Sequence, residues 1–242
     1  MIFGLRPVIE AIEAGKTFDK IFVQKGLQGE LAAKLRQVAR THGLGLLSVP
    51  AEKLNRLTRK NHQGVVAFIS PIAFADIDHI IDQCFAAGRN PLIVYLDRIT
   101  DVRNFGAIVR TAEGAGADAV MVPLKGAAQI SGDAMKTSAG ALSLVPICRT
   151  TNPVPQLKNL QQSGLTLIAC TEKTTQTIYE VPLHEPVVII MGAEDSGIDP
   201  AILQLCDYRA AIPMRGQIGS LNVATATGII LYEALRQRLQ AE

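Results

Sequence analysis

The feature that most constrains the fold is an alternation of short apolar runs with helical patterns, which begins at Pro91 and continues to the C-terminus. The apolar runs have the length and composition of buried strands, and they cover residues 92–97, 118–122, 143–147, 166–170, 187–191 and 208–212. Helical patterns separate and follow them at residues 104–114, 133–139, 154–162, 200–206 and 221–240. This alternation predicts an α/β fold with a mostly parallel sheet covered on both faces, whose ligands bind at the carboxyl ends of the strands.

The first 70 residues carry a separate, smaller α/β pattern. Helices are expected at residues 7–14 and 30–40, with a basic helical stretch at 54–60, and strands are expected at 20–23, 44–49 and 65–69. Residues 71–90 contain a proline, a short helix at 77–86 and a Gly-Arg-Asn-Pro exit, a composition that separates packed units. We therefore expect a domain at 1–70, a linker at 71–90 and a second domain at 91–242.

The composition excludes several classes of protein. A net charge of +2 is too small to indicate nucleic-acid binding by itself, so any contact with RNA must be local. The four cysteines form no CxxC pair and the four histidines lack ligand spacing, so we expect neither disulfides nor a metal. No signal peptide or apolar stretch of membrane-spanning length is visible, and a cytoplasmic location is expected.

Two nucleotide-binding motifs are absent. The only Gly-Lys-Thr, at residues 15–17, has Glu10 where a phosphate loop requires its first glycine. The Gly114–Gly116 pair lacks the third glycine of a dinucleotide fingerprint and follows a helical pattern, not a strand. These absences disfavour a nucleotide-dependent oxidoreductase.

Two segments place polar residues just after predicted strands. In the first, Asn104 stands at an expected helix entrance and Arg110 lies six residues further on. In the second, Gly192 follows a buried strand and allows close backbone approach to a ligand, and Glu194 would face a cleft. Each residue also has a structural alternative: a helix cap for Asn104, a solvated side chain for Arg110, and a tight turn with an exposed acidic pair around Glu194.

A third segment, residues 212–233, reads as a strand, a glycine-bearing loop and a helix. Ser220 is the expected N-cap of that helix. The run of small residues from Asn222 to Gly228 permits another backbone to approach closely, although an ordinary capped helix remains open as an alternative.

Taken in order, the three segments resemble the three signature motifs of the SpoU, or TrmH, family of SPOUT RNA methyltransferases. The third motif reads IPMRGQIGSLNVATATGIILYE. One such motif alone is weak evidence, whereas three in order at compatible spacing are strong. The resemblance implies 2'-O-ribose methylation of RNA with S-adenosylmethionine. It also implies a catalytic domain with a C-terminal trefoil knot that forms the cofactor pocket, and a homodimer whose interface includes the last helix and completes the active site.

Site residues follow from the resemblance position by position. The cofactor-binding positions are Gly192, Ile212 and Leu221, and the polar active-site set is Asn104, Arg110, Glu194, Ser220 and Asn222. A guanidinium is a poor base, so we assign Arg110 to the site without assigning it the role of base.

The first 70 residues are similar to the ribosomal-protein L30e-type substrate-binding domain found in many family members. Its expected RNA contacts are Arg56, Arg59, Lys60 and His62, a cluster that could also be an ordinary solvated face. Along its full length the chain is most similar to the bacterial enzymes that methylate a guanosine of 23S ribosomal RNA. A transfer-RNA methyltransferase and a non-catalytic RNA-binding or ribosome-assembly module are the alternatives.

Overall fold

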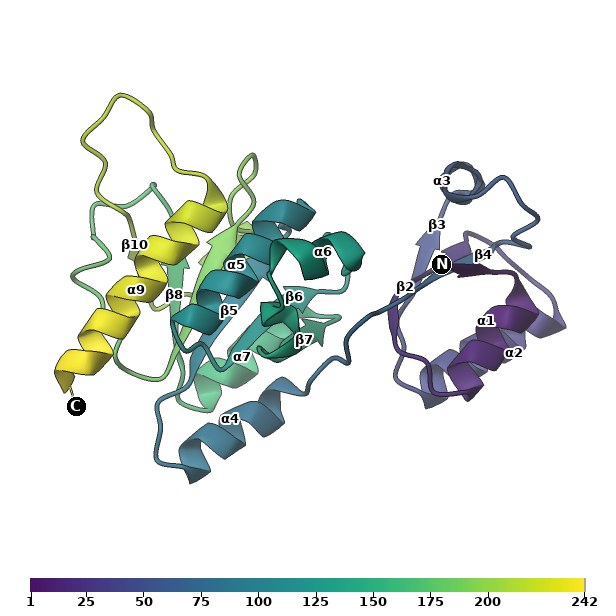
Figure 1. Cartoon of the computed structure of the whole chain (residues 1–242), viewed down its shortest axis with the longest axis horizontal. Coiled ribbons are helices and arrows are strands. Elements are labelled where there is room, and N and C mark those ends of the chain that lie inside the picture. The colour runs from purple at the N-terminus through teal and green to yellow at the C-terminus, as the bar shows by residue number, and fades with distance from the viewer. Residues whose placement is uncertain (242) are drawn as a thin grey trace. The chain divides into compact units, whose positions relative to one another are not determined.

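The computed structural model describes residues 1–241, and these form two compact units (Figure 1). The N-terminal unit comprises Met1–Ala73, and the C-terminal unit comprises Phe74–Ala128 and the chain from Gly132 onward. Each unit has its own sheet and its own buried core. None of the helices in the described residues is long and apolar enough to cross a membrane.

The N-terminal unit is a four-stranded mixed sheet with the order β1-β4-β2-β3. Its strands are β1 (Ile2–Phe3), β2 (Phe18–Gln24), β3 (Leu46–Val49) and β4 (Val65–Ile69), and its helices are α1 (Leu5–Glu13), α2 (Glu30–Thr41) and α3 (Ala51–Leu57). Helices α1 and α2 bury their apolar faces against β2 and β4, with Ile12, Leu35 and Ile21 in the shared core. Other side chains of these strands, Phe22 and Phe68, meet edge to face.

The C-terminal unit contains a six-stranded sheet with the order β10-β8-β9-β5-β6-β7, in which every pair is parallel. Its strands are β5 (Leu92–Asp97), β6 (Ala119–Pro123), β7 (Ile147–Thr150), β8 (Thr166–Cys170), β9 (Val187–Gly192) and β10 (Tyr208–Ala210). Its helices are α4 (Ile77–Ala86), α5 (Val102–Gly114), α6 (Gly132–Thr137), α7 (Pro153–Gln162), α8 (Pro200–Leu203) and α9 (Val223–Ala241), with a 3₁₀ turn at Ala141–Ser143. The expected mostly parallel α/β sheet is confirmed.

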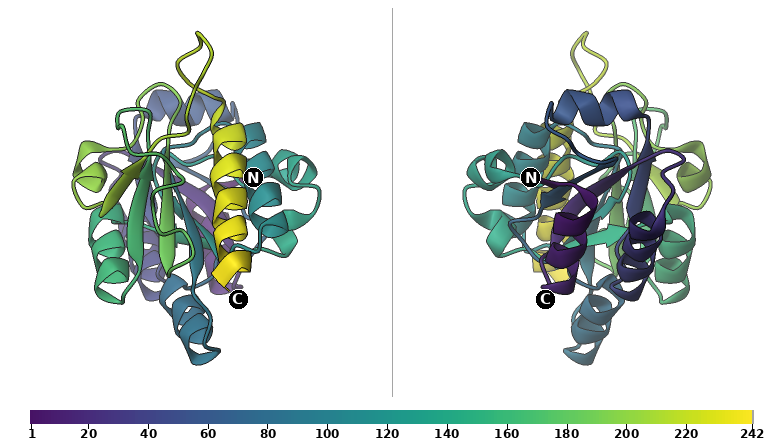
Figure 2. Two further views of the ribbon diagram at one scale, coloured as in Figure 1. Left: turned by 90° about the vertical axis from the view of Figure 1, so that its left-hand side faces the viewer. Right: turned by 90° about the vertical axis from the view of Figure 1, so that its right-hand side faces the viewer.

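Helices cover both faces of this sheet (Figure 2). Helices α4, α7 and α8 bury residues such as Ile81, Leu157 and Ile202 in a cluster that includes Ile93 and Tyr95 of β5. Helices α5, α6 and α9 pack together on the opposite side. All six residues of β5 are buried, as a central strand covered on both faces requires.

The C-terminal helix is tied to the loop between β8 and β9. The Arg238 guanidinium donates hydrogen bonds to the carbonyl oxygens of Asn90, Pro91, Leu183 and Glu185 at 2.6–3.4 Å. Burial lowers the pKa of Arg238. The same loop pairs with the chain after β10, where Thr177 and Ala211 form a parallel bridge. The loop over residues 171–186 therefore contacts the chain both before α9 and along it.

One predicted strand was wrong. The apolar run at 143–147 starts at the last residue of the 3₁₀ turn and continues as an irregular segment, and β7 begins only at Ile147. Pro146 has no N–H to donate to a sheet ladder, so the strand starts at the residue that follows it and pairs with Val120. Within the run Val145 is buried in the core, whereas Leu144 is exposed.

Candidate functional site

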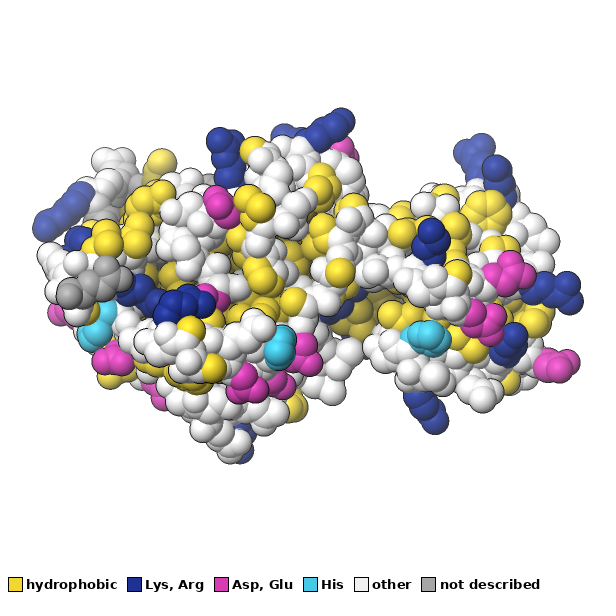
Figure 3. All heavy atoms as spheres, turned by 60° about the horizontal axis from the view of Figure 1, so that its bottom comes forward, with side chains coloured by type: hydrophobic (Ala, Val, Ile, Leu, Met, Phe, Trp, Pro, Cys, Tyr) yellow, Lys and Arg dark blue, Asp and Glu magenta, His cyan; other side chains and the backbone are white. Residues whose placement is uncertain are grey.

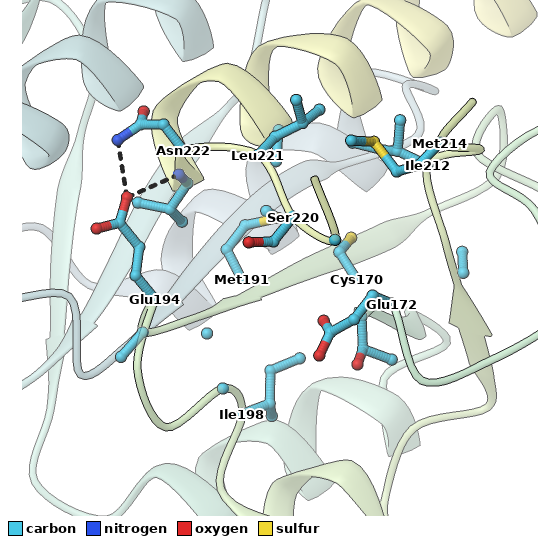
Figure 4. Close-up of a pocket in the computed structure, with 18 residues that line it drawn as sticks. Cys170, Glu172, Met191, Glu194, Ile198, Ile212, Met214, Ser220, Leu221 and Asn222 are labelled. Carbon is cyan, nitrogen blue, oxygen red and sulfur yellow. Dashed lines mark hydrogen bonds between the residues drawn. The ribbon is translucent and has the colours of Figure 1, made fainter. Parts of the chain in front are cut away.

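A cavity of about 360 Å³ lies at the carboxyl ends of β8, β9 and β10. Three segments that are distant in the sequence build it: the loop after β8, the loop after β9 and the long connection from β10 to α9 (Figure 4). Its volume is within the usual range for a small-molecule site, and its place in the sheet is the one expected for a parallel α/β fold.

The walls of the cavity are mainly apolar, with polar groups gathered at a few points. The apolar lining consists of Met191, Ala193, Ile198, Ala210, Ile212, Met214, Leu221, Val223 and Ala226. The polar side chains are those of Thr171, Glu172, Glu194, Ser220 and Asn222. Burial raises the pKa of the Cys170 thiol, so this lining residue stays protonated at neutral pH and acts as part of the apolar wall.

Gly192 allows the loop after β9 to fold back on itself. A Cβ atom added there would lie 2.3 Å from the carbonyl carbon of Gly197 and 2.4 Å from the nitrogen of Ile198. Gly197 has a φ of 66° and its N–H donates to the Ala193 carbonyl at 2.8 Å, which closes a tight turn. The backbone itself therefore forms one wall of the cavity.

The Asp97 carboxylate holds the far end of this turn. It is buried at the end of β5, where its Oδ2 atom accepts a hydrogen bond from the Asp199 N–H at 2.7 Å. Arg98 lies 3.1 Å from the same oxygen and donates to the Gly197 carbonyl at 3.2 Å. These contacts anchor the loop after β9 to the neighbouring central strand.

Glu194 joins the loop after β9 to two helices. Its Oε1 atom accepts hydrogen bonds from Asn222 Nδ2 at 2.7 Å, from the Val223 N–H at 3.1 Å and from Asn104 Nδ2 at 3.4 Å. Asn222 Nδ2 also donates to Asn104 Oδ1 at 3.0 Å. Figure 4 shows Glu194 and Asn222 facing each other at one side of the cavity. A carboxylate at this position is favourable because α9 begins there and its first N–H groups point toward the oxygen.

The cap of α9 differs from the one expected, and the alternative of a helix cap for Asn104 does not hold. Asn222, not Ser220, caps α9, since its Oδ1 accepts from the N–H groups of Ala224 at 3.0 Å and Thr225 at 3.3 Å. Asp101, not Asn104, caps α5. Each cap lies where its oxygen reaches the unpaired N–H groups of the first turn. The Asn104 side chain is thereby left to bind Glu194 and Asn222.

The structure brings most of the predicted site residues together. Gly192, Glu194, Ile212, Ser220, Leu221 and Asn222 all line the cavity, and Asn104 is hydrogen-bonded to two of them. Arg110 is different, since it is exposed further along α5 and does not line the cavity. The assigned roles of these residues remain predictions.

Two residues of the cavity, and one that holds its wall, were not predicted from the sequence. Thr171 and Glu172 follow β8, which lies beside β9 in the sheet, and Asp97 ends β5 on the other side of β9. The signal was present, because polar residues directly after a predicted parallel strand lie at the ligand-binding edge. The strand order, which the local pattern does not contain, was needed to identify them.

In the N-terminal unit, Arg56, Arg59 and Lys60 are exposed at and after the end of α3. His62 is bonded within the chain: its Nδ1 accepts from the Gly64 N–H at 3.0 Å, and its Nε2 lies 2.9 Å from Asn55 Oδ1. Figure 3 shows basic and acidic side chains interspersed on the face of this unit that it draws. No group of metal-ligating side chains occurs among residues 1–241.

Two protein-family models match the chain. The SpoU rRNA Methylase family matches residues 91–232, and the domain described as RNA 2'-O ribose methyltransferase substrate binding matches residues 1–75. Together these matches cover the sheet, the cavity and the N-terminal unit.

The chain is also similar to named proteins over most of its length. It is 36% identical to a 23S rRNA (guanosine-2'-O-)-methyltransferase, RlmB, from Haemophilus influenzae, and the match covers 98% of each chain. Among solved structures, the AdoMet complex of the SpoU methyltransferase AviRb from Streptomyces viridochromogenes aligns with a TM-score of 0.62 at 28% identity, over 99% of this chain and 90% of the other. The TrmH/SpoU tRNA modifying enzyme of A. aeolicus aligns with a TM-score of 0.58 at 35% identity, over 63% of this chain and 78% of the other.

The close approach at Gly192 gives a first prediction. Replacing Gly192 by alanine forces the backbone of Gly197 and Ile198 to move, so we expect the free energy of unfolding to fall by about 1–3 kcal/mol. Denaturant unfolding of the purified chain measures this change. Gly219→Ala is the matched control, because a Cβ at that cavity-lining glycine meets nothing within 4 Å. Equal stability of the two variants would contradict the role assigned to Gly192.

Proposed function

Because the chain belongs to the SpoU rRNA methylase family, we propose that it transfers the methyl group of S-adenosylmethionine to the ribose 2'-hydroxyl of a guanosine in 23S ribosomal RNA. The observation that carries this proposal is the convergence of Asn104, Glu194 and Asn222 at the side of a cavity built by three loops. The full-length similarity to a 23S guanosine methyltransferase supports the choice of RNA.

The cavity fits the cofactor. Apolar side chains such as Ile212 and Leu221 suit the adenine ring, and the exposed backbone around Gly192 can donate and accept hydrogen bonds at its edges. When bound, S-adenosylmethionine supplies an electrophilic methyl group on a sulfonium. A related structure with AdoMet bound supports this assignment.

The polar residues are assigned to positioning. A 2'-oxygen must approach the methyl carbon in line with the bond that breaks, and holding two reactants in such a geometry can lower a barrier by about 7–11 kcal/mol. Asn104 and Asn222 present amide groups whose orientations are set by Glu194 Oε1. Ser220 adds a hydroxyl on the cavity wall. In this assignment Glu194 orients its neighbours, because its Oε1 atom accepts three hydrogen bonds from them.

Arg110 is proposed to reach the site of a second copy of the chain. It is exposed on α5, which packs against α9, and it does not line the cavity of its own chain. Helix α9 also exposes Ile229, Tyr232 and Leu239, whose side chains are 37%, 54% and 62% accessible. A homodimer that covers this apolar face would bring Arg110 near the partner's cavity, where a guanidinium can bind phosphate or donate to the 2'-oxygen.

The N-terminal unit is proposed to bind the RNA substrate. Its match to an RNA methyltransferase substrate-binding domain supports this role. Arg56, Arg59 and Lys60 are available for phosphate contacts, and His62 holds the turn that follows them. We propose a substrate-binding domain over residues 1–70 and a catalytic domain over 91–242. Of the residues expected as a linker at 71–90, α4 packs into the core of the C-terminal unit. Ribosomal RNA as the substrate, and the bacterial relatives, favour a cytoplasmic location.

Transfer RNA is the second candidate substrate, since a structural relative is named as a tRNA modifying enzyme. The purified protein, given tritiated S-adenosylmethionine and unmodified 23S or transfer RNA, is expected to label 23S RNA at one 2'-O-methylguanosine. Label confined to transfer RNA would show that transfer RNA, not 23S RNA, is the substrate. No label with either RNA would favour a non-catalytic role in RNA binding or ribosome assembly.

Arg110 gives a sharper test. We expect Arg110→Ala to lower turnover by on the order of 100-fold, the usual effect of removing a group that stabilises developing charge, with an unchanged Kd for S-adenosylmethionine. Arg209→Ala, at an exposed arginine of β10, is the control. We expect Asn222→Ala alone to be inactive as well, because Asn222 lines the cavity. If the site is shared between two copies, mixing Arg110→Ala with Asn222→Ala should restore activity. Near-normal turnover of Arg110→Ala would show that Arg110 is not part of the active site.

The basic residues at and after the end of α3 predict that RNA binding depends on salt. Replacing Arg56, Arg59 and Lys60 together by alanine should weaken RNA binding and reduce the slope of log K against log salt by about 2. The control replaces Lys16, Lys34 and Arg40, which lie on or beside α1 and α2. Binding titrations at several salt concentrations measure both quantities. Equal salt slopes for the two triple variants would show that the RNA does not contact Arg56, Arg59 and Lys60.

A further inference from the structure

The charged side chains that line the cavity have one sign. Glu172 and Glu194 both line it, and no lysine, arginine or histidine does so among the described residues. The cofactor site proposed above is therefore acidic, although the chain as a whole has a net charge of +2. A small-molecule site that is acidic in a weakly basic protein favours a cationic ligand.

The two carboxylates are in different situations. Glu194 is engaged by Asn104, Asn222 and the first N–H of α9. Glu172 makes no hydrogen bond or ion pair with any residue that the structure describes, and it extends from the loop after β8 toward Ile198 across the cavity (Figure 4). Its negative charge is therefore available to a ligand.

The charge of the cofactor changes during the reaction. S-adenosylmethionine carries a positive sulfonium. As the methyl group moves to the 2'-oxygen, the S–CH₃ bond breaks and its electron pair stays on sulfur, an O–CH₃ bond forms, and the hydroxyl proton leaves to solvent. The product, S-adenosylhomocysteine, has an uncharged thioether, so an acidic side chain in the pocket attracts the substrate form more strongly than the product form.

We propose that Glu172 is a specificity-determining residue of the cofactor site, which favours binding of S-adenosylmethionine over S-adenosylhomocysteine through its negative charge. This inference rests on the proposed function. Glu172 is exposed, so solvent and salt screen its field and its effect is of the size seen for surface ion pairs. A preference of this size would lessen inhibition by the product.

Isothermal titration of the full chain with each ligand tests the proposal. We expect Glu172→Gln, which removes the charge and keeps the size of the side chain, to raise the Kd of S-adenosylmethionine by about threefold to fivefold. The Kd of S-adenosylhomocysteine should change by less than about twofold. Sinefungin, whose amine carries a positive charge near the sulfonium position, should follow S-adenosylmethionine. The difference between wild type and variant should shrink as salt is raised.

Glu113→Gln is the matched control, because it removes the same charge from an exposed position on α5 that does not line the cavity. It should leave all three affinities unchanged. Equal weakening of the charged and uncharged ligands by Glu172→Gln would show that the residue acts by shape or hydrogen bonding, and unchanged affinities would show that it does not act; either result overturns the proposal. A wild-type chain that binds neither S-adenosylmethionine nor its product would instead overturn the proposed function.

Discussion

The arrangement of the polar residues in the site depends on the Glu194 carboxylate. A single oxygen receives hydrogen bonds from α5, from the side chain that caps α9 and from the backbone of α9 itself. These groups come from segments separated by up to 118 residues, so the contact joins parts of the chain that have no local reason to be neighbours. The partial positive charge at the start of α9 favours a carboxylate there. Without it, the amides of Asn104 and Asn222 would lose the partner that orients them.

The sheet places this carboxylate. Strands β5 and β9 pair in parallel along their whole length, up to Asp97 opposite Gly192. The loops after both strands therefore begin side by side at the same edge of the sheet. Asp97 then holds one end of the loop after β9, and Glu194 connects its other side to α9. The turn between them is tight only because Gly192 has no side chain. Backbone pairing, a buried carboxylate and a glycine thus together set the shape of the cavity wall.

Local patterns predicted much of the fold. Apolar, β-branched runs such as Val187–Gly192 have one stable arrangement, a strand buried on both faces, and the strands after 91 were located from them with one exception. The exception, at residues 143–147, shows the limit of the pattern, since an apolar run in an irregular segment, with Val145 buried and Leu144 exposed, has the same composition as one in a strand. The cap of α9 was misassigned to Ser220 for a related reason. Several residues near the start of a helix can act as its cap, and the backbone path decides which oxygen reaches the free N–H groups.

The sequence by itself determined the class of fold, the two-part organisation of its patterns and the motif residues, because strand burial and motif chemistry depend on residue types at short spacing. Only the tertiary structure decided which of these residues meet. It joined Asn104 to Asn222 and left Arg110 outside the cavity of its own chain. It also added Glu172, which no motif marks, by pairing β8 with β9. The physical reason is that strand order and helix packing depend on contacts between distant segments, and these are settled by the burial of the whole core.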